Sequence, residues 1–353
     1  MKFRLHPFFL IYLIVFFLSC CKKSDGSPEK DLNPTKGDVY CVGSEENANG
    51  ISVAKLWKNG EAVMLTDGKK NAHANAVFVS GSDVYIAGHE MADNGGIVAK
   101  LWKNTAAVDL SDGQNIADAL SVYVYGADVY VAGFVSNITG STATLWKNGI
   151  ATVLGSGVTH NNKANSVFVS DGNVYVAGFE NPTANVSIAK LWKNGIEFSI
   201  SDGLHQAGLN AVFVSGNDVY LAGYENTVNE ERAILWKNGV PVELSIDYEL
   251  NAVFVKDKNV FLTGKYVGSI PALSQIQVYP AFWKNNLFIP ISQDSLIYQS
   301  HANAVFVSAD KEYIAGNYLN SNSKKVASIW VNGKLTSLTS GVHNAYLSSI
   351  FVK

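Results

Sequence analysis

All seven tryptophans of this chain fall at one position of an internal repeat, and this periodicity constrains the fold more than any other feature. Consecutive tryptophans are separated by 45, 44, 46, 44, 47 and 47 residues. The seven are Trp57, Trp102, Trp146, Trp192, Trp236, Trp283 and Trp330. Regular repeats of this length indicate structural units that stack on their neighbours. We therefore expect one repeat architecture through most of the chain.

Each repeat contains four short runs with the composition of β-strands. In the second repeat these runs are 75–79 (NAVFV), 84–88 (VYIAG), 99–102 (AKLW) and 107–112 (AVDLSD). β-Branched and aromatic residues dominate the first two runs, as strands prefer. Four antiparallel strands per repeat are typical of a propeller blade. We call them the first to fourth strands of the blade.

The two ends of the repeat region predict how the ring closes. The region begins with a second strand, 39–43, and ends with a first strand, 349–352. Seven complete blades exist only if the C-terminal strand joins the N-terminal blade, which also removes the exposed edges of an open array. We predict an all-β fold, a seven-bladed β-propeller of four-stranded antiparallel blades, closed by the C-terminal strand.

The lengths of the connections predict two different faces. In six repeats the aromatic residue of the first strand precedes the glycine of the second strand by ten residues, as in Phe78 and Gly88. The third and fourth strands are joined by W-x-N-G in five repeats, and Asn-Gly favours a two-residue type I′ hairpin. The other two kinds of connection vary in length. We expect them to form a variable face, where binding is most often placed on a rigid scaffold.

The N-terminal segment resembles a bacterial lipoprotein signal. Lys2 and Arg4 precede an apolar run, 7–19, which at 1.5 Å per residue would span about 20 Å, too short for a bilayer core of ~30 Å. The following L-S-C-C resembles a lipobox, which implies acylation of Cys20, with Cys21 as the alternative acceptor. An ordinary secretory peptide is the other interpretation.

These observations divide the chain into three parts. Residues 1–19 are expected to be the signal peptide, 20–37 a lipidated flexible tether rich in polar residues, and 38–353 the propeller. We expect a monomer in the cell envelope, held by its N-terminal lipid, at the outer membrane or cell surface rather than the inner membrane.

Charge and cysteine content exclude several classes of function. Without residues 1–19 the chain has 25 basic and 30 acidic side chains and no basic cluster, so nucleic acid is not an expected partner. Cys41, in a second strand, is expected to be a buried thiol. We expect no cofactor, and no spacing typical of a metal site is present.

The repeat resembles the HAF-type extracellular repeat. The unit A-x-L-W-K-N-G, followed by a small-residue stretch and V-x-V-x-G, carries the resemblance, whereas V-F-V stands where that repeat has I-N. The resemblance implies an extracellular propeller and brings no active site.

The variable face is predicted to carry histidine, glutamate and tyrosine side chains that could bind a ligand. The alternative is that these side chains only bond neighbouring backbone. The candidates are His73, His89, Glu90, Glu180, Glu225, Tyr266, Tyr279, His301 and Tyr318. We assign no catalytic residue. The tryptophans and the lysines that follow them are interpreted as core packing and a solvated rim.

An apolar insertion distinguishes the sixth repeat. Residues 265–280 lengthen the connection between its second and third strands, so that 19 residues separate Gly264 from Trp283 where other repeats have 13 or 14. The insertion could cover the channel mouth, present a contact patch, or be a tolerated surface feature.

Three classes of function remain. The first is a lipid-anchored binding module for a glycan or protein, acting through the variable face. The second is a carbohydrate-active enzyme, a lyase or glycosidase, and a pair of carboxylates about 5 to 10 Å apart would favour the glycosidase. The third is a structural component of the envelope. The fold alone does not choose among them.

Overall fold

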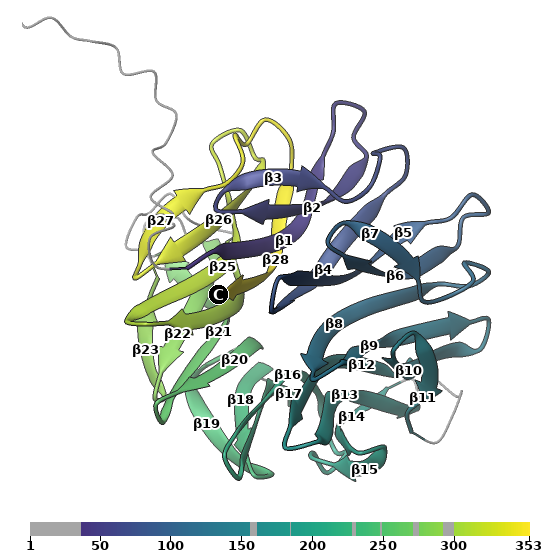
Figure 1. Cartoon of the computed structure of the whole chain (residues 1–353). Coiled ribbons are helices and arrows are strands. Elements are labelled where there is room, and N and C mark those ends of the chain that lie inside the picture. Colours follow the sequence, from purple (N-terminus) through teal and green to yellow (C-terminus); the bar gives the residue numbers. More distant parts are fainter. Residues whose placement is uncertain are drawn as a thin grey trace, which may run out of the picture.

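Each repeat folds into one four-stranded antiparallel sheet, as its four strand-forming runs predict. The computed structural model describes residues 37–155, 161–183, 185–227, 231–247, 249–270, 275–291 and 300–353. These residues form seven sheets that stand as blades around a common centre (Figure 1). The predicted seven-bladed propeller is confirmed.

Within each blade the strands follow one another from the centre of the ring outward. Blade 1 consists of β28 (Ala345–Val352), β1 (Val39–Glu46), β2 (Ser52–Lys58) and β3 (Glu61–Met64). Blade 2 consists of β4 (Ala72–Ser80), β5 (Asp83–Met91), β6 (Ile97–Lys103) and β7 (Ala106–Asp109). Blade 3 consists of β8 (Ala117–Tyr125), β9 (Asp128–Asn137), β10 (Gly140–Lys147) and β11 (Ile150–Val153).

The remaining blades follow the same order. Blade 4 consists of β12 (Lys163–Ser170), β13 (Asn173–Thr183), β14 (Val186–Lys193) and β15 (Ile196–Ser199). Blade 5 consists of β16 (Gln206–Ser215), β17 (Asp218–Asn226), β18 (Glu231–Lys237) and β19 (Val240–Asp247). Blade 6 consists of β20 (Leu250–Lys256), β21 (Asn259–Ile270), β22 (Gln275–Lys284) and β23 (Leu287–Pro290), and blade 7 of β24 (His301–Ser308), β25 (Lys311–Leu319), β26 (Lys325–Val331) and β27 (Lys334–Ser337).

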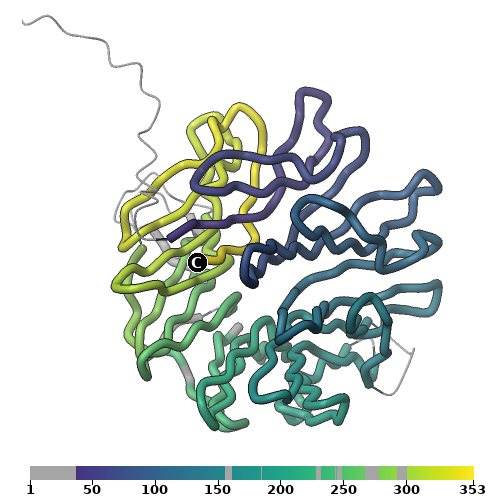
Figure 2. The backbone as a smooth tube through the Cα atoms, viewed as in Figure 1, coloured from purple at the N-terminus to yellow at the C-terminus, as the bar shows by residue number. Residues whose placement is uncertain are grey.

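The C-terminal strand closes the ring in the predicted way. β28 pairs antiparallel with β1, from Val39 opposite Val352 to Glu45 opposite Ala345. Figure 2 shows the yellow end of the chain beside its purple beginning. One apolar cluster joins Cys41 and Trp57 of blade 1 to Ile329 of blade 7, so the closing interface is packed like the others.

The tryptophans pack blade against blade. All seven are at most 3% exposed. Trp102 of blade 2, for example, packs in one cluster with Val42 and Leu56 of blade 1. Cys41 is also buried, and burial raises the pKa of its thiol. Both predictions of core packing are confirmed.

The aromatic residues of the first strands have a different place. They are half-buried and form a closed ring around the centre, in which neighbouring ring centroids lie 4.6 to 5.2 Å apart. We call this ring the aromatic collar. Its members are Phe78, Tyr123, Phe168, Phe213, Phe254, Phe306 and Phe351. Such tilted contacts add to the apolar burial between adjacent blades.

The constant face is built from tight turns with residue-specific geometry. Asn59 and Gly60 both have positive φ, 51° and 83°, as a type I′ turn requires, and four other W-x-N-G turns do the same. The Asn59 side chain also accepts a hydrogen bond from the Val39 amide at 2.8 Å. Thr105 and Asn286 adopt the same conformation without being glycine, with φ of 78° and 65°.

The lysines after the tryptophans are paired as well as solvated. Lys58 lies 2.8 Å from Asp38 and stands over the Tyr40 ring, and blades 2, 3 and 5 repeat this arrangement. These side chains are still about half exposed, so each ion pair contributes little stability. In these blades the lysine after the tryptophan therefore also links the third strand to the start of the second strand.

The second-strand glycines accommodate a bulge in the first strand. In blade 4 the register shifts between Ala164 and Ser166, which brings the Lys163 carbonyl against Gly178. A Cβ on Gly178 would lie 1.9 Å from that oxygen. The bulged asparagine, Asn165, donates to the Leu209 carbonyl of blade 5 at 2.9 Å. The bulge thus directs the Asn165 side chain toward the next blade, where it forms a hydrogen bond.

Both ends of the described chain lie at the constant face. The Lys353 amide donates to the Asp38 carbonyl at 3.0 Å, where β28 ends and β1 begins.

Among the described residues, no helix is long and apolar enough to span a membrane.

Candidate functional site

The blades differ from one another at the variable-face end of their first strands. Five residues before each collar aromatic stands a side chain that changes from blade to blade, whereas the collar position is always Phe or Tyr. We call these residues the upper ring. They are His73, Asp118, Lys163, Gly208, Glu249, His301 and Tyr346.

His73 and His89 connect blades 1, 2 and 3 across the upper ring. The two nitrogens of His73 lie 2.7 Å from the hydroxyls of Ser44 and Ser348. Burial, and then the charge of His89, lower the pKa of His73 to about 4, against the opposing effect of Asp118. His89 Nδ1 lies 2.9 Å from Asp118 Oδ1. Both histidines therefore make contacts that hold the scaffold.

Glu90 and Glu180 form ion pairs within their own blades. Glu90 lies 3.1 Å from Lys100, and Glu180 lies 3.2 Å from Lys190. Lys190 also pairs with Glu197 on the fourth strand. These pairs link the second, third and fourth strands, and a role in ligand binding for the two glutamates stays a prediction.

His301 and Tyr318 lie on blade 7. Burial, and then the charges of Lys325 and Lys265, lower the pKa of His301, while Glu249 opposes them. The Tyr318 hydroxyl lies 3.3 Å from the Ser337 hydroxyl. Neither the environment of His301 nor the contact of Tyr318 indicates a particular ligand.

The insertion of blade 6 lengthens a hairpin. β21 and β22 stay paired from Phe261 opposite Lys284 to Ile270 opposite Gln275. Near its base Tyr266 stacks on Tyr279, with ring centroids 5.2 Å apart, and meets Phe288 of the fourth strand edge-on. The two tyrosines thus pack within the blade. Residues 271–274 of the insertion lie outside the described part of the chain.

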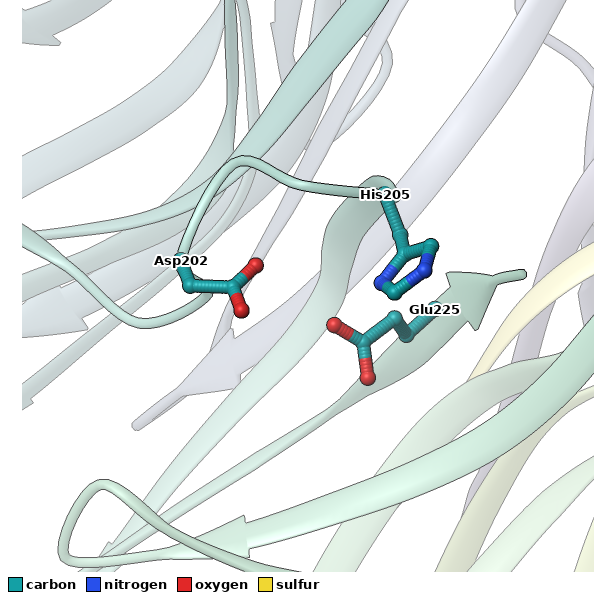
Figure 3. Close-up of side chains that lie close together, drawn as sticks. All are labelled: Asp202, His205 and Glu225. Atoms are coloured by element: carbon teal, nitrogen blue, oxygen red, sulfur yellow. The ribbon is translucent and has the colours of Figure 1, made fainter. Parts of the chain in front are cut away.

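Glu225 belongs to a cluster that the sequence spacing does not reveal. Asp202 and His205 precede β16, and Glu225 stands on β17 (Figure 3). Their potential ligand atoms all lie within 4.8 Å of one another. Within the described ranges this is the one group of three or more such residues close enough to hold a metal ion.

Two features weigh against a metal at this cluster. Asp202 is exposed, and its Oδ1 already accepts the Leu204 amide at 2.8 Å. Arg232 stands opposite Glu225 in the register of β17 and β18, which adds a positive charge to the same region. We assign no metal to this cluster.

A pocket of about 420 Å³ opens on the variable face between blades 3, 4 and 5. Three of its walls are aromatic: Phe134, Phe179 and Tyr224 each directly follow the glycine of a second strand. Its polar lining consists of Ser136, Ser141, Asn161, Asn181, Ser187 and Gln206. Lys163 of the upper ring and Val186 complete it. Its volume is within the range of about 300–1,000 Å³ typical of small-molecule sites.

The upper ring shapes the pocket through one small and one charged residue. Gly208 leaves room for Tyr224, because a Cβ there would lie 3.0 Å from the tyrosine ring. Lys163 Nζ stands 4.6 Å from the centroid of the Phe134 ring. Blades 4 and 5 thus present aromatic surface at a point where blade 2 presents bonded histidines.

The polar lining is partly bonded to the scaffold, since the Ser141 hydroxyl donates to the Asn162 carbonyl at 3.1 Å and the Ser187 hydroxyl to the Ala207 carbonyl at 2.8 Å. Asn181 Oδ1 is buried and has no partner among the described residues. This differs from Asn165 and Asn59, whose amides bond the scaffold. Aromatic surface together with amides and hydroxyls suits a ligand that has both an apolar face and several hydroxyl groups.

The pocket differs from the predicted set of site residues, since none of the nine candidates lines it. A signal for it was present in the sequence. The residue after the second-strand glycine is aromatic in three consecutive blades and otherwise Ser44, His89, Lys265 or Asn317.

Comparisons with known proteins support the fold. The chain matches no protein family and no curated protein. It is similar to the structure of a Mycobacterium tuberculosis puromycin-hydrolyzing peptidase, with a TM-score of 0.58 at 9% identity over 86% of this chain, and it spans 52% of that protein.

It is also similar to the β-propeller domain of the trilobed protease from Pyrococcus furiosus. The TM-score is 0.52 at 10% identity, over 87% of this chain and 96% of that domain. That domain has an open velcro topology, whereas β28 pairs with β1 in this chain. At such identities the two likenesses show a propeller fold and nothing finer.

Proposed function

We propose that this protein is a lipid-anchored binding module of the cell envelope that captures a glycan in the pocket between blades 3 and 5. The observation that carries the proposal is the lining of that pocket: three aromatic rings beside amides and hydroxyls. Sugar rings stack on aromatic faces through their C–H surface and use hydroxyls to bond amides.

The position of the two ends of the propeller supports an orientation in which the pocket faces away from the membrane. Asp38 and Lys353 lie together at the constant face. A lipid on Cys20 would be joined to Asp38 by the 18 residues of 20–37. The constant face would then be turned toward the membrane, and the pocket would open away from it.

The pocket favours binding over glycoside cleavage. Among its lining residues in the described part of the chain there is no carboxylate. Glycoside hydrolysis in most enzymes uses two carboxylates that flank the scissile bond. We therefore propose capture without hydrolysis and expect no hydrolysis product of the glycan.

The test uses the full chain expressed in a bacterium and purified from membranes in detergent. Metabolic labelling with a fatty acid should mark the wild type and lose its signal in Cys20→Ala, with Cys21→Ala as the matched control. The labelled protein is then applied to an array of envelope glycans. Binding to a defined glycan class supports the proposal, and binding to none of them contradicts it.

A further inference from the structure

We infer that the pocket between blades 3 and 5 selects an acidic sugar, a hexuronate residue whose carboxylate pairs with Lys163. This inference rests on the proposed glycan binding and adds the substrate class. A hexuronate has a carboxylate, several hydroxyls and an apolar ring face. One such ligand would therefore contact Lys163, the polar lining and the aromatic walls.

Lys163 has a different environment from most lysines of the variable face. Lys55, Lys100, Lys190 and Lys265 each lie within 3.2 Å of a carboxylate. Within the described ranges, Lys163 has no carboxylate at ion-pair distance, and its one assigned contact is the Phe134 ring. Its charge is therefore not neutralised by the scaffold.

The place of Lys163 in the repeat argues against a purely structural role. Its counterparts in other blades bond the scaffold, as His73 does with Ser348 and Asp118 with Asn75. The upper ring does not repeat, and only blade 4 has a lysine there. A lone cation beside aromatic walls is the arrangement expected for an anionic ligand with an apolar face.

The other residues of the pocket also favour an acidic sugar. Tyr224 occupies the space that Gly208 leaves open, and Phe179 lies between it and Phe134 in the order of the blades. Asn181 and Gln206 add amides to the lining, and the exposed Gln206 can bond the hydroxyls of the sugar. With one positive and no negative side chain in the lining, the pocket favours an anion and disfavours a cation.

The experiment measures the affinity of the full detergent-solubilised chain for two matched probes by titration calorimetry. One probe is a tetramer of galacturonic acid and the other a neutral galactose tetramer with the same linkage. We expect the acidic probe to bind at least tenfold more tightly at low salt, and the difference to shrink as salt rises.

Two variants separate the role of Lys163 from general charge. Lys163→Gln should weaken the acidic probe by about tenfold to hundredfold, the range for a lost hydrogen bond to a charged group, and leave the neutral probe within twofold. Lys325→Gln is the matched control, because Lys325 also stands over an aromatic ring, Tyr346 at 4.7 Å, outside the pocket. It should bind both probes like the wild type. Equal thermal unfolding midpoints of the two variants verify that both are folded.

Each outcome decides between the sugar class and the proposed function. Equal affinity for both probes, unchanged in Lys163→Gln, would overturn the acidic-sugar inference and leave glycan binding intact. Failure of both probes, when the envelope array also shows no binding, would overturn the proposed function itself. A glutamate-rich peptide that binds as tightly as the acidic sugar would show that the pocket recognises charge alone, and would overturn both.

Discussion

The partly buried imidazole of His73 predicts a loss of stability in mild acid. His73 is held neutral between Ser44 and Ser348, and its pKa in the folded protein is about 4. An unfolded histidine has a pKa of about 6.5, so the unfolded chain binds a proton more readily between these values. Stability must therefore fall as the pH falls from about 6.5 toward 4.

The magnitude follows from the two pKa values. At pH 5 the unfolded imidazole is almost fully protonated and the folded one is mostly neutral, which lowers the free energy of unfolding by about 2 kcal/mol relative to pH 8. The variant His73→Gln removes this titration and keeps a side chain able to bond both serines.

The assay compares wild type and His73→Gln by urea unfolding at pH 8, 6.5 and 5. Other histidines titrate in both proteins, so only the difference between their pH profiles reports His73. We expect the wild type to lose about 2 kcal/mol more than the variant between pH 8 and pH 5. Parallel pH profiles would refute the burial of a neutral His73.

Three further predictions concern the turns, the ring closure and the pocket. Thr105→Gly should raise the free energy of unfolding by about 0.5–1 kcal/mol in urea titrations, because a β-branched residue is strained at φ of 78°; no gain would contradict that strain. Ending the chain at Gly341 removes β28 and exposes the edge of β1, so gel filtration should show aggregates and unfolding should lose cooperativity. A stable monomer would contradict closure. Gly208→Ala should displace Tyr224, weaken glycan binding and leave the unfolding midpoint within a few degrees; unchanged affinity would place the ligand elsewhere.

The sequence predicts the scaffold well because the scaffold repeats. The tryptophan spacing implies seven blades, the incomplete first and last repeats imply closure by β28, and Asn-Gly implies the turn type at Asn59. Each of these features is enforced by local backbone geometry or by packing that is the same in every blade. A single sequence therefore shows the tryptophan in all seven repeats and Asn-Gly in five, whereas the closure follows from the two ends of the repeat region.

The pocket was harder to predict because it consists of residues that do not repeat. Whether Phe134, Phe179 and Tyr224 meet depends on the angle between adjacent blades and on the variable connections, which no spacing in the sequence fixes. The histidines and glutamates were predicted as site residues because their side chains can bind ligands. In the structure, His73 and Glu180 bond scaffold partners instead.

The most direct test of the central claim is a matched pair of phenylalanine variants in blade 4, with binding of the acidic tetramer measured by calorimetry. Phe179 lines the pocket, and Phe198 lies on the outer strand β15 with 47% of its surface exposed. We predict that Phe179→Ala weakens binding about fivefold to 150-fold, since stacking on an aromatic ring contributes about 1–3 kcal/mol by analogy with bases, and that Phe198→Ala binds like the wild type. Equal affinity in the two variants would contradict the assignment of the variable-face pocket as the binding site.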